Sequence, residues 1–289
     1  MKSQKSFVED RKASLYLVPT PIGNLEDITL RALKILQNVD VIAAEDTRNT
    51  RKLLTHFAIQ TPIMSYHEHN KKTGGEKLIR LLAEGKTIAL VSDAGMPAIS
   101  DPGYELIQDV IHNGFPVIAI PGANAALTAL IASGIQPQPF YFHGFLPRKK
   151  QEREKMLADL KGMRATMVFY EAPHRLKETL EAMFQTWGDR EIVLARELTK
   201  KFEEYLRGTL LEALDWVKRE TVRGEFCLIV EGAAAGENEE LSFWWQSLSV
   251  KEHVQYYVEK GESVKEAIKK TAKERGMNRR EVYRIFHIE

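Results

Sequence analysis

Residues 90–103 read Leu-Val-Ser-Asp-Ala-Gly-Met-Pro-Ala-Ile-Ser-Asp-Pro-Gly, an apolar strand that runs directly into a long loop of small residues. Residues 88–91 suit a buried strand, Asp93 and Gly95 allow a close backbone turn, and residues 103–111 form an amphipathic helix. The loop therefore follows the carboxyl end of a strand, where open α/β sheets bind ligands. An ordinary strand-to-helix connection explains the same spacing equally well.

The composition is that of a globular chain. Its 289 residues suffice for about two domains, and 44% of them are hydrophobic, 28% are charged, and the net charge is +1. No apolar run is long enough to span a membrane, and the polar residues 1–5 precede no signal-peptide core, so we expect a cytoplasmic protein. The single cysteine, Cys227, excludes an intramolecular disulfide and a cysteine cluster for a metal.

Short apolar segments alternate with helical patterns along the first half of the chain. Strands are predicted at residues 15–18, 41–44, 62–65, 88–91, 117–120 and 140–142, with helices at 29–39 and 76–82 between them. This alternation predicts an α/β fold with a mainly parallel sheet covered by helices.

A second unit begins after residues 144–150, where Gly-Phe-Leu-Pro is followed by three basic residues. Strands at 166–170, 192–195 and 226–230 alternate there with helices at 151–160, 176–187 and 210–219. Residues 232–240 have the composition of a solvated linker. We therefore predict an N-terminal α/β domain at 1–145, a C-terminal α/β domain at 146–235, and a linker with a basic helical extension at 236–289.

The extension has three predicted helices, at residues 250–260, 264–275 and 278–287. The last two are joined by Gly276-Met277 and resemble a helix-turn-helix. Residues 263–287 hold eight Lys or Arg against three Glu, a net charge of +5. This charge favours a surface for nucleic-acid phosphates, although a solvated basic helix face has the same pattern.

Several familiar site motifs are incomplete or absent in this sequence. Gly85-Lys86-Thr87 lacks the first glycine of a P-loop and precedes a strand, and no G-x-G-x-x-G occurs. His67-Glu68-His69 offers two ligands without an identifiable third, so we expect no metal.

The loops after the predicted strands carry the stronger signal. They lie at residues 19–25, 45–48, 66–70, 92–103 and 121–125, and they share one edge if the sheet is parallel. The last of them brings backbone N–H groups at a helix start near the Asp93 loop, which suits a ligand with a carboxylate and hydroxyl groups. An adenosine-bearing amino acid has those groups.

The ordered motifs resemble the tetrapyrrole methylase superfamily of S-adenosylmethionine-dependent methyltransferases (class III methyltransferases), and within it the ribosomal RNA small subunit methyltransferase I family. The resemblance covers the whole chain. It rests on residues 19–25, 44–48, 68–70, 92–95, 100–103, 144–147, 173–175, 195–200 and 224–226. The sequence departs from the family pattern at Met96, where Thr is expected, and at Ala172, where Ser is more usual.

The resemblance implies methyl transfer from S-adenosylmethionine to the ribose 2′-hydroxyl of a cytidine in the decoding region of small-subunit (16S) rRNA. It also implies a two-domain fold with the cofactor in the cleft between the domains, and a homodimer. Cofactor contacts carry over to Asp93, Ala94, Gly95, Ala98, Asn124, Ala125, Glu171 and Ala195, with Pro21 lining the same cleft.

The expected partner is small-subunit rRNA or the 30S subunit. Positive charge for RNA is expected from Arg148, Lys149, Lys150, Arg153, Arg175, Arg196 and Lys201, and from Lys269, Lys270, Arg279 and Arg280 of the extension. Such phosphate contacts make binding strongly salt-dependent.

Attack on a sulfonium methyl is an in-line displacement, so alignment and exclusion of water dominate the catalysis. A ribose hydroxyl is a weak nucleophile, and a base or a nearby cation accelerates its reaction by about 10²- to 10⁴-fold. His174, Glu197 and Lys200 are the candidates, with Arg175 and Arg196 as clamps for phosphate or carboxylate. Each of these residues would equally suit a surface ion pair.

Two other functions fit parts of the sequence. One is a small-molecule C-methyltransferase that acts on a tetrapyrrole ring, although a flat macrocycle has no need of a basic helix-turn-helix. The other is a non-catalytic ribosome assembly factor on the same fold, which would not bind the cofactor.

Overall fold

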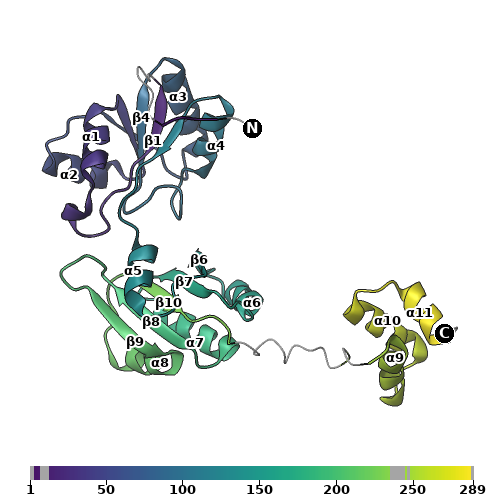
Figure 1. Cartoon of the computed structure of the whole chain (residues 1–289). Coiled ribbons are helices and arrows are strands. Elements are labelled where there is room, and N and C mark those ends of the chain that lie inside the picture. Colours follow the sequence, from purple (N-terminus) through teal and green to yellow (C-terminus); the bar gives the residue numbers. More distant parts are fainter. Residues whose placement is uncertain (1–2, 7–12, 235–244, 246–247, 288–289) are drawn as a thin grey trace. The chain divides into compact units, whose positions relative to one another are not determined.

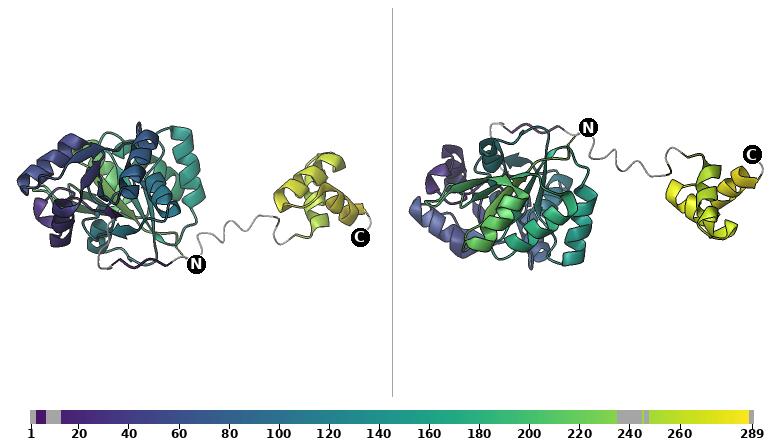
Figure 2. Two further views of the ribbon diagram at one scale, coloured as in Figure 1. Left: turned by 90° about the horizontal axis from the view of Figure 1, so that it is seen from above. Right: turned by 90° about the horizontal axis from the view of Figure 1, so that it is seen from below.

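The computed structural model describes residues 3–6, 13–234, 245 and 248–287. The chain forms two compact units, Met1–Gly232 and Ala233–Glu289; many of their elements are labelled in Figure 1, and Figure 2 shows two further views. Most of the predicted linker, from residue 235 onward, lies outside the described residues. No helix in the described parts of the chain is long and apolar enough to cross a membrane.

The first sheet is entirely parallel. Its strands are β1 (Ser14–Leu17), β2 (Val41–Ala44), β3 (Ile63–Ser65), β4 (Thr87–Val91) and β5 (Val117–Ala119). They lie in the order β3-β2-β4-β1-β5. The predicted parallel sheet is confirmed, and the carboxyl ends of its strands share one edge.

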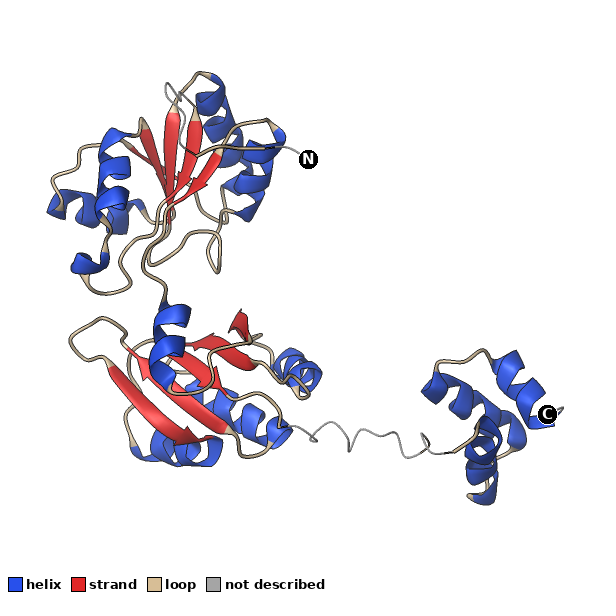
Figure 3. Cartoon of the chain, viewed as in Figure 1, coloured by secondary structure: helices blue, strands red, loops and turns tan. Residues whose placement is uncertain are grey.

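Helices cover both faces of this sheet (Figure 3). They are α1 (Leu30–Asn38), α2 (Thr47–His56), α3 (Lys71–Ala83) and α4 (Tyr104–His112), and a short 3₁₀ helix spans Leu25–Asp27. Side chains alternate between the faces because a strand has a period of two residues. Ile42 and Ala44 of β2 pack with α1 and α2, whereas Ala43 packs with α3 and α4.

The second sheet is mixed. Its strands are β6 (Phe140–Phe145), β7 (Thr166–Glu171), β8 (Glu191–Arg196), β9 (Glu204–Thr209) and β10 (Phe226–Val230), in the order β6-β7-β10-β8-β9. Only β6 and β7 run parallel. One face packs on α6 (Lys150–Leu160), α7 (Leu176–Trp187) and α8 (Leu210–Arg219), and the other on α5 (Ala125–Ser133).

One strand lies elsewhere than the sequence pattern predicts. The segment at 140–142 closes the first run of alternating elements in the sequence, but β6 pairs with β7 in the second sheet. The physical reason is α5, whose Ala129 and Leu130 bury against Val168 and Val193 of that sheet. The chain has therefore left the first sheet before β6 begins. The division of this unit near residue 145 stays a prediction.

The C-terminal unit is a three-helix cluster of α9 (Val250–Glu259), α10 (Val264–Arg275) and α11 (Arg279–His287). Its core holds Val254, Ala267, Ile268, Ala272 and Val282. Helix α10 ends at Gly276, whose φ of 64° is a left-handed conformation that favours glycine. The predicted turn between α10 and α11 is confirmed.

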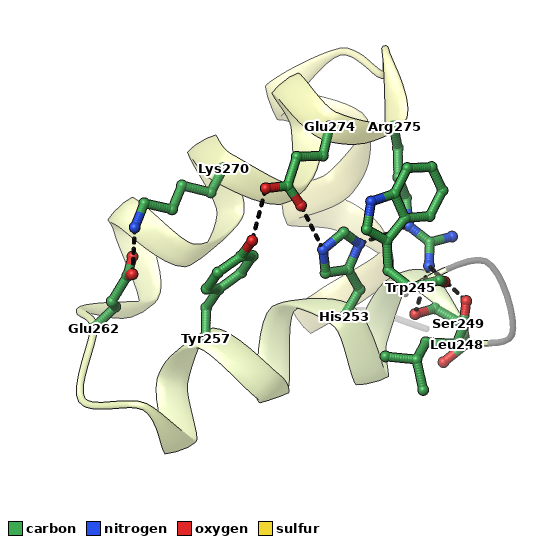
Figure 4. A network of polar contacts seen from close by, with 9 residues as sticks. All are labelled: Trp245, Leu248, Ser249, His253, Tyr257, Glu262, Lys270, Glu274 and Arg275. Atoms are coloured by element: carbon green, nitrogen blue, oxygen red, sulfur yellow. Dashed lines mark hydrogen bonds and ion pairs between the residues drawn. The ribbon is translucent and has the colours of Figure 1, made fainter. Parts of the chain in front are cut away.

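A polar network ties α9 to α10 (Figure 4). His253 is fully buried, and its Nε2 lies 2.8 Å from Glu274 Oε2. The Tyr257 hydroxyl donates to the other Glu274 oxygen at 2.7 Å. Arg275 Nε donates to His253 Nδ1 at 3.0 Å, and its Nη2 donates to the carbonyl of Trp245 at 3.0 Å. These bonds and the small core join α9 to α10.

Candidate active site

The loop after β4 is fixed to the loop after β1. Thr20 and Gly95 exchange two backbone hydrogen bonds of 3.0 Å, and the Thr20 hydroxyl donates to the Ser92 carbonyl at 3.1 Å. Gly95 has a φ of 77°, and a Cβ there would lie 3.2 Å from Ile22 Cγ2. The backbone conformation and the close approach both favour glycine at this position.

Asp93 is oriented by the start of α2. Its Oδ1 accepts a hydrogen bond from the Asp46 backbone N–H, and its Oδ2 accepts one from Asn49 Nδ2, both at 3.2 Å. The predicted loop at 45–48 thus meets the loop at 92–103, as expected for loops at one edge of a parallel sheet.

A cavity of about 350 Å³ lies between these loops and the second sheet. Its lining combines apolar side chains with five carboxylates. The lining residues are Ile22, Asp93, Ala94, Gly95, Met96, Ile99, Ser100, Asp101, Asn124, Ala125, Phe145, Tyr170, Glu171, Ala172, Ala195, Glu197, Leu198, Lys200, Glu225, Phe226 and Cys227. Both departures from the family pattern, Met96 and Ala172, are in this lining.

Most of the residues predicted to contact the cofactor lie together in this lining. They are Asp93, Ala94, Gly95, Asn124, Ala125, Glu171 and Ala195. Pro21 instead lines a neighbouring hollow of about 240 Å³ that shares Asp93. Ala98 is in neither lining; it packs against Gly103, where an added Cβ would lie 2.9 Å from Ala98 Cβ.

The second sheet supplies one wall of the cavity. Tyr170 accepts a hydrogen bond from the Ala126 N–H at the start of α5, at 3.2 Å. Burial raises the pKa of Tyr170 to about 12, so its hydroxyl stays neutral. Ala195 and Cys227 are buried beside it, and burial raises the pKa of the Cys227 thiol to about 12. Cys227 is therefore an inert part of the wall.

Lys200 is held beside the cavity by a strained turn. Glu197 and Thr199 have φ angles of 51° and 65°, and Lys200 Nζ donates to Glu197 Oε1 at 3.0 Å and lies 3.6 Å from Glu225 Oε2. Burial lowers the pKa of Lys200, but these two carboxylates outweigh burial and the net pKa is raised. Lys200 is therefore a fixed cation at neutral pH, and its ammonium has no lone pair with which to accept a proton.

The other residues with predicted catalytic or clamping roles lie outside the cavity lining. His174 is exposed. Arg175 Nη2 donates to the carbonyls of Leu146 and Pro147 at 2.8 and 3.1 Å, and Arg175 Nε lies 3.5 Å from Glu171 Oε1. These contacts give Arg175 a structural role at the start of α7.

The residues with predicted RNA contacts differ in exposure. Arg153 is only 4% exposed and pairs with Glu178 at 3.3 Å, so its burial does not fit the predicted phosphate contact. Arg196 pairs with Glu204 and stacks on Trp216, with 5.5 Å from its Cζ to the ring centre. The exposed residues are Arg148, Lys149, Lys150, Lys201, Lys269, Lys270, Arg279 and Arg280, of which Lys149, Lys150, Lys269 and Lys270 also pair with glutamates.

Sequence reasoning missed several residues of the lining. Asp101 belongs to the loop at residues 92–103, but the sequence pattern indicates only Asp93, Ala94, Gly95 and Ala98 of that loop as cofactor contacts. Burial raises the pKa of Asp101, the Asp93 charge raises it further, and the Ser92 hydroxyl opposes both. Tyr170 immediately precedes the predicted Glu171 on β7 and points to the opposite face of the sheet. The alternation of side chains along a strand shows that Tyr170 and Glu171 face opposite ways, but it does not show which of the two faces the ligand.

The fold places this chain in a class of methyltransferases. Residues 14–214 match the family of Tetrapyrrole (Corrin/Porphyrin) Methylases, and the chain belongs to it. The cobalt precorrin-4 methyltransferase CbiF matches 75% of this chain and 94% of its own with a TM-score of 0.58 and 19% identity. Uroporphyrin-III C-methyl transferase from Thermus thermophilus, complexed with S-adenyl homocysteine, matches 75% and 96% with a TM-score of 0.54 and 17% identity. These two likenesses show the fold alone.

Similar proteins with known names assign the chain to a narrower family. Ribosomal RNA small subunit methyltransferase I of Bacillus subtilis (strain 168) is 59% identical over 95% of this chain and 94% of its own. The protein of the same name from Halalkalibacterium halodurans is 57% identical over the full length of both chains, and that from Synechocystis is 44% identical over 94% of this chain and 96% of its own. The chain is a methyltransferase of this ribosomal RNA small subunit methyltransferase I family.

Proposed function

We propose that this protein transfers a methyl group from S-adenosylmethionine to the ribose 2′-hydroxyl of a cytidine in the decoding region of small-subunit rRNA. The observation that carries the proposal is the cavity, where five carboxylates and the fixed Lys200 ammonium meet between the loops of the parallel sheet and the second sheet. The relationship to rRNA methyltransferases over nearly the whole chain supports the substrate class.

The cavity fits S-adenosylmethionine in size and chemistry. A volume of about 350 Å³ lies within the range of small-molecule sites. The sulfonium and ammonium groups of this ligand are cations, and carboxylates such as Asp93 and Asp101 complement them. Ile22, Ala125 and Leu198 offer apolar surface to an adenine ring. The complex of a structural neighbour with S-adenyl homocysteine agrees with this assignment.

The bound cofactor supplies an electrophilic methyl group. The chain's own residues then have to orient the ribose and exclude water. The Lys200 ammonium, at the rim of the cavity, stabilises negative charge that develops on the ribose oxygen. Glu197 positions Lys200 through the 3.0 Å bond, and so acts on the reaction through another residue.

RNA binding needs cations outside the cavity. Arg148 and Lys201 are exposed on the first unit, and Arg279 and Arg280 are exposed at the start of α11. The family match ends at residue 214, whereas the full-length rRNA methyltransferase relatives also cover the C-terminal unit. We therefore assign α10 and α11 to docking on rRNA phosphates.

The proposal includes a cytoplasmic location, a homodimer, and the division of the first unit into domains 1–145 and 146–235. Light scattering of the full chain tests the dimer, since the mass of one chain is 33.0 kDa.

The decisive experiment is transfer of radiolabelled methyl from S-adenosylmethionine to 30S subunits that lack the modification, followed by digestion to nucleosides. Naked 16S rRNA is treated in parallel. Label in 2′-O-methylcytidine is the expected result. Tight cofactor binding without label in either RNA would favour a small-molecule substrate, and the absence of cofactor binding would favour an assembly factor.

A further inference from the structure

Helix α11 exposes an aromatic ring on its outer face. Side chains three or four residues apart share one face of a helix, and the inner face of α11 packs into the unit through Val282, which is fully buried, and Phe286. Tyr283 is 54% exposed and belongs neither to this core nor to the side chains packed against it. The C-terminal unit therefore does not need the Tyr283 ring for its fold.

Basic side chains surround this ring. Arg279 lies one turn before Tyr283 and His287 one turn after it, and Arg280 and Arg284 are their exposed neighbours on the helix. The ring centres of Tyr283 and His287 are 4.4 Å apart, with an angle of 50° between the ring planes. These five residues together are called the outer face of α11.

The three arginines of the outer face differ from the lysines of α10. Lys269 and Lys270 pair with Glu266 and Glu262, respectively. Within the described part of the chain, no carboxylate forms an ion pair with an α11 arginine, and Glu281 is the one acidic residue of that helix. The three guanidinium groups are therefore available to the phosphates of a polyanion, which arginine can bind through two parallel hydrogen bonds.

An exposed ring among cations matches the chemistry of single-stranded RNA. Unpaired bases stack on aromatic side chains, and basic side chains hold the backbone phosphates beside them. A base inside a duplex is already stacked on its neighbours, and side chains cannot read the deep, narrow major groove of A-form RNA. A duplex would thus use the arginines but leave Tyr283 without a partner.

We propose that the outer face of α11 binds single-stranded RNA, with one unpaired base stacked on Tyr283 and the neighbouring phosphates on the α11 arginines. The inference rests on the function proposed above and specifies the form of rRNA that the C-terminal unit takes. Every base has a π face, so this contact increases affinity and places the strand without selecting a particular base.

The test is Y283A in the full chain, with Y283F and Y104A as matched variants. Y283F keeps the ring, and Y104A removes a ring that is 63% exposed on α4 of the first unit. The probes are a fluorescein-labelled oligouridine of about 12 nucleotides, within the size range of single-strand sites, and a blunt RNA duplex of equal length.

Fluorescence anisotropy gives the Kd of each variant for each probe. Y283A should bind the oligouridine about 5- to 100-fold more weakly than the wild type, because one stacked base is lost. Its Kd for the duplex should stay within twofold. Y283F and Y104A should match the wild type on both probes. The slope of log K against log salt should be unchanged in Y283A, since no charge is removed.

A second readout reports the stacking itself. A 2-aminopurine at the centre of the oligouridine loses emission when it stacks on an aromatic ring. Saturating wild type and Y283F should quench it, and Y283A should not. Hydrogen exchange of residues 250–287 checks that the unit stays folded. If protection falls in Y283A, then Y283L, which keeps an apolar side chain on the helix, replaces it in both measurements.

Three outcomes would overturn the assignment. Equal losses on the oligouridine and the duplex would mean that Tyr283 supports the helix and stacks on no base. An oligouridine Kd within twofold of wild type would exclude the stacking contact. Weaker binding of Y283A to 30S subunits, with no loss on the oligouridine, would indicate a ribosomal protein as the partner. The proposed function fails on a different result, the absence of methylation of 30S subunits and of naked 16S rRNA by the wild type.

Discussion

Lys200 crosses Gly23 so closely that a Cβ at residue 23 would lie 2.4 Å from Lys200 Cγ and 3.1 Å from the Leu198 carbonyl oxygen. Real Cβ atoms essentially never come within 3.0 Å of a non-bonded heavy atom from another part of the chain. The loop after β1 is thus fitted against the turn after β8, and the first sheet fixes the position of a cation carried by the second.

Gly23→Ala is expected to displace Lys200 and lower the single-turnover rate. A misplacement of about 1 Å costs up to roughly 10²-fold, so we expect a loss of between tenfold and a hundredfold. Binding of S-adenosylhomocysteine should stay within a few-fold. Gly75→Ala is the control, because a Cβ there meets its nearest neighbour at 4.0 Å. An unchanged rate in Gly23→Ala would show that the contact has no role in positioning.

Lys200→Met removes the charge and keeps most of the side-chain volume. We expect turnover to fall by about 10²-fold, which is typical when one electrostatic stabiliser is lost. S-adenosylhomocysteine affinity, measured by calorimetry, should persist. Lys177→Met on α7 is the matched control, since Lys177 is exposed and outside the cavity lining. Single-turnover rates equal to wild type would remove Lys200 from the mechanism.

The parallel sheet was predictable because its strands are short apolar runs that alternate with amphipathic helices. Helix α2 was not predicted as a helix because residues 47–56 are mostly polar, and only Thr50 and Leu54 are buried. Strand β9 was missed for a similar reason. None of its residues is fully buried, and its identity depends on pairing with β8, which a single sequence does not reveal.

The candidate site was predictable where loops follow parallel strands, because topology alone brings Asp93, Asn124 and their neighbours together. Arg153 shows that a run of basic residues in the sequence does not predict which of them are exposed. It belongs to a basic run in the sequence, yet its helix turns it inward onto Glu178, since the long aliphatic stem suits burial.

Removal of two exposed cations from α11 tests the docking role. The R279A/R280A variant should bind 30S subunits more weakly, and the slope of log K against log salt should fall by about 1.5, because each phosphate contact contributes about 0.7 to 0.9. K34A/K77A removes two exposed cations from the first unit and serves as the control. An unchanged salt slope in R279A/R280A, measured by filter binding, would contradict the assignment of α11.

The C-terminal unit should lose stability in mild acid. Burial lowers the pKa of His253, the bond to Glu274 opposes this effect, and the Arg275 charge adds to it. Because Arg275 Nε donates to His253 Nδ1, that nitrogen carries no proton in the folded unit, and protonation would break the bond.

The direction in which stability changes with pH follows from the lowered pKa of His253. In the unfolded chain a histidine takes up its proton at about pH 6.5, and in the folded unit His253 does so only at lower pH. The stabilising contribution is therefore present above pH 6.5 and is lost as the pH falls below it. Hydrogen exchange of peptides from residues 250–287, corrected for intrinsic rates, should show less protection at pH 5.5 than at pH 7.5. Peptides from α7 provide the internal reference. Greater protection at pH 5.5 would mean instead that His253 is charged and paired with Glu274, and that Arg275 has moved away from it.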